Sequence, residues 1–361
     1  MKIALLSCLP PYRGGISQFN ASLLEELGKW HDMKAFNFKR QYPSFLFPGK
    51  TQFVPEASAL PADALLDTLN PFSWRKTARA IRAFAPDVLV LPYWMSWFAL
   101  PLGYVARRAG CPVTIGLLHN ALPHEPHWFD KPLTRYFLKG CQGFVTLSDS
   151  VRRDLLSLKA DARVRTLFHP PYGQFGERLP REEAAARLGL DPAKKTLLFF
   201  GLIREYKGLD LLLEAFRGLP EEYQLVIAGE PYGSFDRYRS ILDSLPGKER
   251  VHCFLSYIPD AEVARFFSVA DAVVLPYRSA SQSGIGAIAA HFGTPMVVTP
   301  VGGLPAEAES LGTGIVAAGT GPEDIREAIE RLSRDEIQVE NKRPGWEDFA
   351  KEFGSFAATL I

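Results

Sequence analysis

Residues 196–208 read Thr196-Leu-Leu-Phe-Phe-Gly201-Leu-Ile-Arg204-Glu-Tyr-Lys207-Gly208. The first five residues predict a short strand without polar alternation, which is typical of a parallel sheet covered by helices on both faces. Apolar residues then recur at helical spacing, at Leu209, Leu212, Leu213 and Phe216. The stretch is therefore a strand–loop–helix unit of a doubly wound sheet, with glycines and two cations in its loop.

The same alternation of apolar strands and amphipathic helices runs through all 361 residues. The predicted strands of the first half are Lys2–Ser7, Lys34–Phe38, Asp87–Leu91, Pro112–Leu117, Gly143–Leu147 and Val164–Phe168. Those of the second half are Thr196–Phe200, Gln224–Ala228, Val251–Phe254, Ala272–Pro276, Pro295–Thr299 and Gly314–Ala317. Two such series predict an α/β protein with two Rossmann-like domains, each a doubly wound parallel sheet.

The boundary is predicted in the stretch that begins at Pro170-Pro171-Tyr172-Gly173 and is rich in Pro, Gly and charge. We therefore expect domains at residues 1–172 and 173–343. Residues 344–361 predict a further helix, packed back towards the N-terminal domain through Trp346, Phe349, Phe353 and Phe356.

Composition excludes several classes of protein. The 41 Lys+Arg nearly cancel the 40 Asp+Glu, whereas a general nucleic-acid binder carries a basic excess. The four cysteines are scattered and form no CxxC pair, which favours buried thiols in a reducing compartment. No run approaches the roughly 18 apolar residues of a membrane span, and no signal peptide is evident. We expect a cytoplasmic protein.

The loops of the second domain carry the clearest chemistry. Arg204 and Lys207 directly follow a strand, at the carboxyl edge of the sheet where ligands bind, and there they would bind phosphate. The alternative is that they form a solvated surface pair. Ser283-Gly284 precedes another helix and suits an anion, although Ser283 is equally a plain helix cap. The next predicted strand, Pro295–Thr299, is followed by a double glycine at 302–303 and then by Glu307.

The first domain repeats these devices. Gly14 and Gly15 follow the first strand and precede a helix, which suits a phosphate or serves only as a tight turn. His119 and Asn120 end another strand at the ligand edge, where His119 is either catalytic or structural. His124, Glu125 and His127 follow closely, but HxxH on a proline-broken loop lacks the helix of a metal motif, so we predict no metal site.

The order and spacing of these pieces resemble the family 4 (group 1) glycosyltransferases along essentially the whole chain. The resemblance is carried by Pro-Pro-Tyr-Arg-Gly-Gly-Ile at 10–16, His-Asn at 119–120, and residues 199–208, 257–263, 270–277 and 292–305. It implies the GT-B fold, two Rossmann-like domains flanking an interdomain cleft, and a retaining enzyme that needs no metal or other cofactor.

The resemblance also implies roles for individual residues. His119 would lie near the transferred sugar, and Arg204 and Lys207 would neutralise the diphosphate of a UDP- or GDP-sugar. The other donor-binding residues would be Gly14, Gly15, Gly201, Tyr257, Ile258, Gln282, Ser283, Gly284 and Glu307. Asn120, His124 and Glu125 would bind the acceptor, a glycan, lipid-linked glycan or small metabolite, with no nucleic acid involved.

One departure stands out. The family has two glutamates separated by seven residues, and the matching positions hold Ala280 and Ile288. We interpret the loop Ser281-Gln282-Ser283-Gly284 as a polar replacement. The missing carboxylates also leave open an unusual donor or a non-catalytic nucleotide-sugar-binding scaffold. A GT-B sugar epimerase is a further alternative to a transferase.

Residues 36–50 mix aromatics with Lys39, Arg40 and Lys50. We favour an ordered loop over the acceptor site. The alternative is that the segment rests on an anionic membrane surface, in peripheral contact with the inner face of the membrane. The choice of acceptor would be set by the loops at residues 40–75 and 92–100.

Overall fold

The structure is a computed structural model. It describes residues 1–43, 52–53, 60–123, 127–167, 169–170, 172, 175–280, 283–310, 314–334 and 345–361. The chain divides into two compact units, Met1–His169 with Pro344–Ile361, and Pro170–Arg343. The division follows His169, whereas the sequence placed it after residue 172. Among the described residues, no helix is long and apolar enough to cross a membrane.

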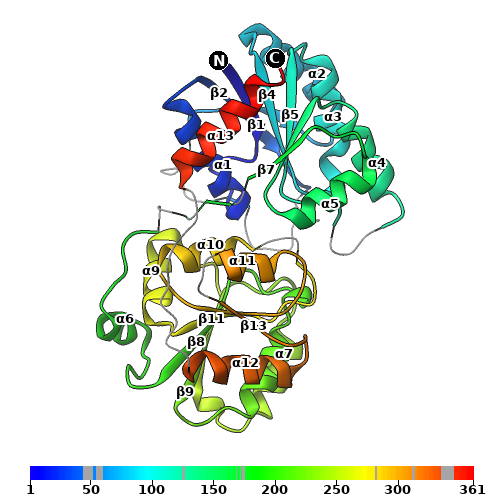
Figure 1. The fold of residues 1–361 in the computed structure, drawn as a ribbon. Helices are drawn as coiled ribbons and strands as arrows, with labels where there is room; N and C mark the ends of the chain where they lie inside the picture. The colour runs from blue at the N-terminus through cyan, green and yellow to red at the C-terminus, as the bar shows by residue number, and fades with distance from the viewer. Residues whose placement is uncertain are drawn as a thin grey trace. The chain divides into compact units, whose positions relative to one another are not determined.

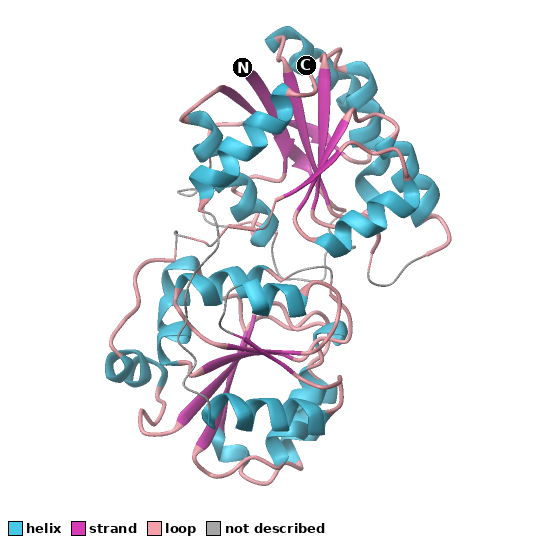
Figure 2. Ribbon diagram, in the orientation of Figure 1, coloured by secondary structure: helices cyan, strands magenta, loops and turns pink. Residues whose placement is uncertain are grey.

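The first unit is a seven-stranded parallel sheet in the order β3-β2-β1-β4-β5-β6-β7 (Figures 1 and 2). Its strands are β1 (Lys2–Ser7), β2 (Asp32–Arg40), β3 (Asp63–Asp67), β4 (Val88–Tyr93), β5 (Val113–Leu118), β6 (Gly143–Thr146) and β7 (Val164–Thr166). Its helices are α1 (Gly15–Gly28), α2 (Pro71–Phe84), α3 (Ala99–Arg108), α4 (Asp130–Leu138), α5 (Asp149–Leu158) and α13 (Trp346–Ala358). The strand order reverses between β1 and β4, as in a doubly wound fold.

Alternate side chains of each strand face the two helix layers. Ile3 and Leu5 of β1 pack in a core with Phe19 of α1 and Phe353 of α13. Ala4 and Leu6 face the opposite core, which contains residues of α2, α3, α4 and α5. The C-terminal helix α13 lies against α1 and so belongs to the first unit.

The second unit is a six-stranded parallel sheet in the order β10-β9-β8-β11-β12-β13. Its strands are β8 (Lys195–Phe200), β9 (Tyr223–Ala228), β10 (Val251–Phe254), β11 (Ala272–Leu275), β12 (Met296–Val298) and β13 (Gly314–Val316). Its helices are α6 (Arg181–Leu188), α7 (Leu209–Arg217), α8 (Asp236–Asp243), α9 (Asp260–Val269), α10 (Gly284–His291), α11 (Leu304–Ser310) and α12 (Pro322–Arg334). Short 3-10 turns occupy Ser96–Phe98, Glu205–Lys207 and Lys248–Arg250.

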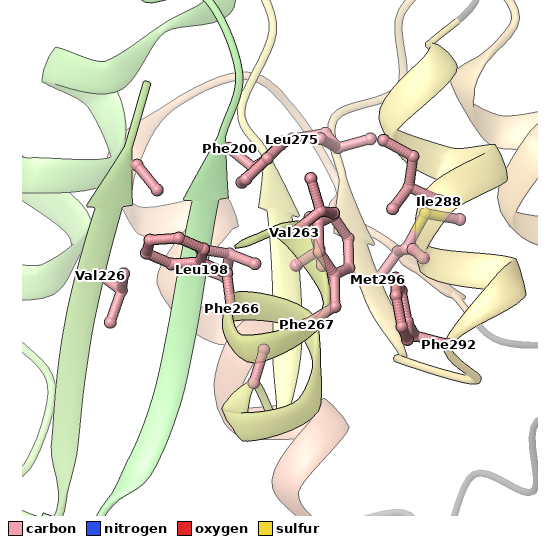
Figure 3. Close-up of a cluster of buried hydrophobic side chains, with 14 of the residues drawn as sticks. Leu198, Phe200, Val226, Val263, Phe266, Phe267, Leu275, Ile288, Phe292 and Met296 are labelled. Atoms are coloured by element: carbon pink, nitrogen blue, oxygen red, sulfur yellow. The ribbon is translucent and has the colours of Figure 1, made fainter. Parts of the chain in front are cut away.

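One face of this sheet packs on α9 and α10 through a cluster of large apolar side chains (Figure 3). Leu198 and Phe200 of β8 meet Phe266 and Phe267 of α9, and the Phe200 and Phe267 rings are 5.0 Å apart. The continuous apolar strands follow from this burial on both faces, as predicted. This core fixes the carboxyl ends of β8 and β11, where the candidate site lies.

The strand predictions are confirmed at twelve positions, with end shifts of a few residues. Phe168, at the end of one predicted strand, lies outside the described residues. The strand β3 was missed because Asp63-Ala-Leu-Leu-Asp67 is short and charged at both ends. It forms the edge of the sheet, where only one neighbour, β2, has to be paired.

Candidate functional site

The loops predicted to bind the donor follow neighbouring strands of the second unit. Residues 201–208 follow β8, residues 276–283 follow β11, and residues 299–303 follow β12. All these strands are parallel, so their carboxyl ends share one edge. The chain order reverses between β8 and β11, and a crevice for a ligand forms at such a switch point.

Lys207 is the most unusual side chain at this edge. It is only 8% exposed, and among the described residues its ammonium makes no hydrogen bond or ion pair. Burial, with a smaller effect of the Arg204 charge, lowers the pKa of Lys207 from 10.5 to about 8. A buried ammonium without a carboxylate is costly, so this geometry suits an anion supplied from outside the chain.

Arg204 lies beside it and is half-buried. Its guanidinium carbon lies 4.3 Å from the ring centroid of Tyr232 and 5.5 Å from that of Tyr206. No ion pair of Arg204 with a described residue occurs. The other cations near this loop differ, since Arg237 and Arg278 both bind Asp210.

The cation loop is fixed to the chain that follows β11. The Arg278 amide donates to the Tyr206 carbonyl at 2.7 Å, and the Arg278 guanidinium donates to the Glu205 carbonyl at 3.0 Å. The same guanidinium binds both carboxylate oxygens of Asp210, at 2.7 and 2.8 Å. Burial alone would raise the pKa of Asp210, but the hydrogen bond and charge of Arg278, with the charge of Arg237, hold it below its usual value.

Gly208 ends the cation loop in a left-handed conformation, at φ 67°. A Cβ atom at this position would collide with the carbonyl oxygen of Pro276. Glycine is therefore required here both by its backbone angle and by the close approach of the two loops. Arg278, Asp210 and Gly208 together set where Lys207 lies.

The start of α10 reaches the same place. An atom built at the Cβ position of Gly201 would lie 3.1 Å from Nζ of Lys207 and 3.2 Å from Cδ1 of Ile285. Tyr277 spans the two sides, with its ring centroid 5.7 Å from Nζ of Lys207 and its hydroxyl 3.4 Å from that of Ser283. The structure therefore brings residues 201–208 and the described part of the 281–285 turn together.

Ser283 caps α10, because its hydroxyl accepts a hydrogen bond from the Ile285 amide at 3.3 Å. The Ser283 amide donates to Oε2 of Glu307 at 3.1 Å. Glu307 comes from α11, and its carboxylate occupies space that a Cβ on Gly286 would fill. A carboxylate at a helix N-terminus is favoured by the helix dipole. Glu307 therefore holds the turn, and the Gly284 amide remains at the first position of α10.

The positions of the missing glutamates are apolar and buried. Ala280 is 8% exposed and Ile288 is 6% exposed, and both belong to the core cluster of the second unit. Figure 3 shows Ile288 among those side chains. A carboxylate nonetheless exists at this edge, because Glu307 delivers one from a different helix. Gln282, the other proposed replacement, lies outside the described residues.

Tyr257 and Ile258 follow the edge strand β10 and precede α9. The Ile258 side chain packs in the core cluster, and Tyr257 is half-buried. Any contact of Ile258 with a nucleobase would therefore have to be made by its main chain.

In the first unit, His119 follows β5 and is 5% exposed. Burial, with a smaller effect of His169, lowers the pKa of His119 to about 3, so the ring is neutral. Among the residues that the structure describes, its buried Nε2 has no hydrogen-bond partner. Phe19 of α1 contacts both His119 and His169, each with ring centroids 4.9 Å apart. Sequence reasoning missed His169, which carries no motif of its own.

The remaining predicted residues of the first unit are placed less fully. Gly14 and Gly15 lie between β1 and α1, with Gly14 at φ 113°, and Asn120 is half-buried. His124 and Glu125 lie outside the described residues. His127 is exposed, with Nδ1 3.6 Å from Oδ2 of Asp130. Over the part of the chain that the structure describes, no group of three His, Cys, Asp or Glu side chains is placed to hold a metal ion.

Two family models match the chain. Residues 180–353 match "Glycosyl transferases group 1", and residues 14–171 match "Glycosyl transferase 4-like domain". A D-inositol 3-phosphate glycosyltransferase of a Mycobacterium species is 30% identical over 71% of this chain and 62% of its own length. A GDP-mannose:glycolipid 4-beta-D-mannosyltransferase of Xanthomonas campestris is 28% identical over 70% of this chain and 72% of its own. The chain spans between 56% and 62% of the first mycobacterial relatives.

Solved structures agree on the fold. Sucrose-phosphate synthase from Thermosynechococcus elongatus superposes with a TM-score of 0.77 at 17% identity, over 99% of this chain and 98% of that one. HepE from Anabaena, solved in complex with UDP, superposes with a TM-score of 0.72 at 14% identity, over 100% of this chain and 98% of that one. With both units matched by family models and the whole length by these folds, the chain belongs to the family 4 (group 1) glycosyl transferases and has their two-unit GT-B fold.

Proposed function

We propose that this protein is a glycosyltransferase whose second unit binds the diphosphate of a nucleotide sugar through Arg204 and Lys207. The observation that carries the proposal is the buried ammonium of Lys207, which has no partner among the described residues and lies next to the start of α10. A diphosphate bound here would balance the buried positive charge. HepE, which was solved with UDP and with UDP-glucose, supports a donor of this class.

The chemistry follows from the charge that develops when the sugar–phosphate bond breaks. The departing nucleoside diphosphate gains negative charge, and fixed cations and helix amides stabilise it without reorganising. Lys207 supplies a point charge, and Arg204 supplies planar donors. The Gly284 amide lies at the first position of α10, where no intrahelical acceptor exists. Glu307 would fix that turn and bind the donor as a hydrogen-bond acceptor.

In the first unit, we propose that the neutral His119 and Asn120 face the transferred sugar and the acceptor. A neutral imidazole can exchange hydrogen bonds with sugar hydroxyls, and burial keeps His119 in that form. The acceptor would be a glycan, a lipid-linked glycan or a small metabolite. The names of the relatives, an inositol-phosphate transferase and a glycolipid transferase, support this range. Retention of the anomeric configuration and a cytoplasmic location are part of the proposal.

A panel of UDP- and GDP-sugars tests the proposal. We expect one of them to raise the melting temperature, since a ligand bound only by the native state stabilises it. The same donor should then be consumed with a matching acceptor. Binding without donor hydrolysis or transfer would favour the non-catalytic scaffold, an alternative that the replacement of two glutamates by Ala280 and Ile288 supports. Conversion of the donor sugar without an acceptor would identify an epimerase.

Chelation tests metal independence. If Arg204 and Lys207 neutralise the diphosphate, excess EDTA should change the initial rate of transfer by less than about two-fold, because no metal charge is needed in the transition state. Readdition of Mg²⁺ or Mn²⁺ is the control. A rate that collapses with EDTA and returns with either ion would contradict this part of the proposal.

Arg278→Ala tests how the cation loop is held. Arg278 binds the loop main chain and Asp210, so its loss should let Lys207 shift and lower kcat/KM for the donor by about 10- to 100-fold. Arg237→Ala is the matched control, because Arg237 binds Asp210 and Glu205 only through side chains. It should cost less than about three-fold. Equal effects of the two variants would refute the positioning role.

A further inference from the structure

The charge of the chain is distributed unevenly along the sequence. Residues 71–139 contain nine Lys or Arg and only three Asp or Glu, whereas the whole chain has 41 against 40. The excess is concentrated in α2, α3 and α4 and just after α4. The basic residues are Arg75, Lys76, Arg79, Arg82, Arg107, Arg108, Lys131, Arg135 and Lys139. We call these nine residues the basic face.

Three helices display this face on one side of the first unit. α3 packs against both α2 and α4, and all three cover the same face of the sheet, opposite α1 and α13 (Figure 1). Every residue of the basic face is exposed, and none makes an ion pair with a described residue. The carboxylates that the structure describes here are engaged elsewhere: Asp87 accepts from the Lys2 amide, and Asp130 is buried against Ser96.

Large apolar side chains are exposed where the same helices begin. Phe72 is 84% exposed at the start of α2, Leu100 is 46% exposed at the start of α3, and Trp128 is 88% exposed just before α4. The helices return antiparallel to the strands, so their starts lie along the carboxyl edge of the sheet. The basic face is thus bordered at the helix starts by exposed apolar side chains, and cations combined with exposed Trp, Phe and Leu are typical of surfaces that lie on membranes.

We propose that the basic face of α2, α3 and α4 docks on an anionic lipid bilayer, with Phe72 and Trp128 entering the headgroup region. Exposed cations that pair with no described carboxylate complement anionic headgroups, although Arg82 and Arg107 also donate to main-chain carbonyls. Aromatic side chains favour the membrane interface, where one end is apolar and the other is wet. A nucleic acid would use the cations but would leave the separated apolar side chains at the helix starts in water, which favours the bilayer.

This surface differs from the one that the sequence indicated. In residues 36–50, Phe36 and Phe38 are buried in the core strand β2, and Arg40 pairs with Asp67 through two hydrogen bonds. Residues 44–50 lie outside the described residues. The described half of the segment therefore belongs to the internal strand β2. The basic face, which was not recognised from the sequence, is the surface that we propose for membrane contact.

Vesicle co-sedimentation of the full chain tests the proposal. We expect binding to vesicles of phosphatidylcholine with phosphatidylglycerol, weakened by salt, and little binding to phosphatidylcholine alone. Arg75→Gln with Arg79→Gln should weaken binding about 30-fold, from two contacts at the lipid surface. Both residues are exposed in α2, and glutamine keeps the helix propensity, so the fold is retained.

Arg239→Gln with Lys248→Gln is the matched control, since these two exposed cations belong to the second unit. It should bind vesicles as the wild type does. Trp128→Ala should reduce vesicle binding about ten-fold. This loss should persist at high salt, because salt screens charges and not apolar contacts. The proposal is overturned if both double variants lose binding equally, if neither does, or if single-stranded RNA is bound at a salt concentration that releases the vesicles.

Discussion

Lys207→Met should lower kcat/KM for transfer by about 10²–10³-fold and at the same time make the protein more stable. The loss of activity follows because one fixed charge that stabilises the leaving group is removed. The gain in stability follows because methionine fills the site without burying a charge. Steady-state kinetics and denaturant unfolding of the same variant measure the two effects.

The pH dependence gives this prediction a second signature. Folding lowers the pKa of Lys207 from 10.5 to about 8, so the unfolded chain binds more protons between these values. The ammonium therefore costs stability below about pH 8, and the wild type should regain about 3 kcal/mol relative to Lys207→Met as the pH rises to 10.5. Unchanged turnover in the variant, or a loss of stability at neutral pH, would show that Lys207 is structural.

Gly208→Ala should abolish most of the activity and destabilise the second unit. The new methyl group would meet the Pro276 carbonyl, so the loop that carries Lys207 and Arg204 must move away from the chain after β11. Overpacking of this kind costs about 1–3 kcal/mol, and a displacement of about 1 Å at a catalytic group can cost about 10²-fold in rate.

Gly189→Ala is a closely matched control. Gly189 ends α6 at φ 67° and ψ 33°, the same backbone angles as Gly208, but no atom of the described chain lies within 4 Å of its Cβ position. Both variants carry the same left-handed strain of roughly 1 kcal/mol. Only Gly208→Ala should lose more stability than that and lose transfer. If the two variants behave alike in denaturant unfolding and in kinetics, contact with Pro276 does not position the loop.

The sequence predicted the framework because the framework depends on local patterns. The apolar run at 196–200 followed by Gly201 and a helical stripe is a complete strand–loop–helix signal, and the apolar runs alone predicted twelve strands in the correct order. The failure at β3 has the opposite cause. An edge strand needs little apolar surface, so Asp63-Ala-Leu-Leu-Asp67 carries too little pattern to be distinguished from a loop.

Within the site, the sequence predicted where the loops lie but not how they are held. Arg204 and Lys207 were found because they follow a strand directly. Arg278 and Asp210, which pair with each other, are 68 residues apart in the sequence, so no local sequence pattern predicts their contact. The same is true of Glu307, whose contact with the Ser283 amide depends on the packing of α11 beside α10. The isolation of the Lys207 charge is likewise a tertiary property, since only folding buries it.

Calorimetric titration of nucleoside diphosphate against nucleoside monophosphate, for the wild type and Lys207→Met, tests the central claim most directly. The base that the wild type prefers is used, with UDP and GDP as starting points. We predict that Lys207→Met weakens diphosphate binding about 100-fold and changes monophosphate binding by less than about five-fold. Diphosphate binding that survives the substitution would contradict the assignment of Arg204, Lys207 and the start of α10 as the diphosphate site.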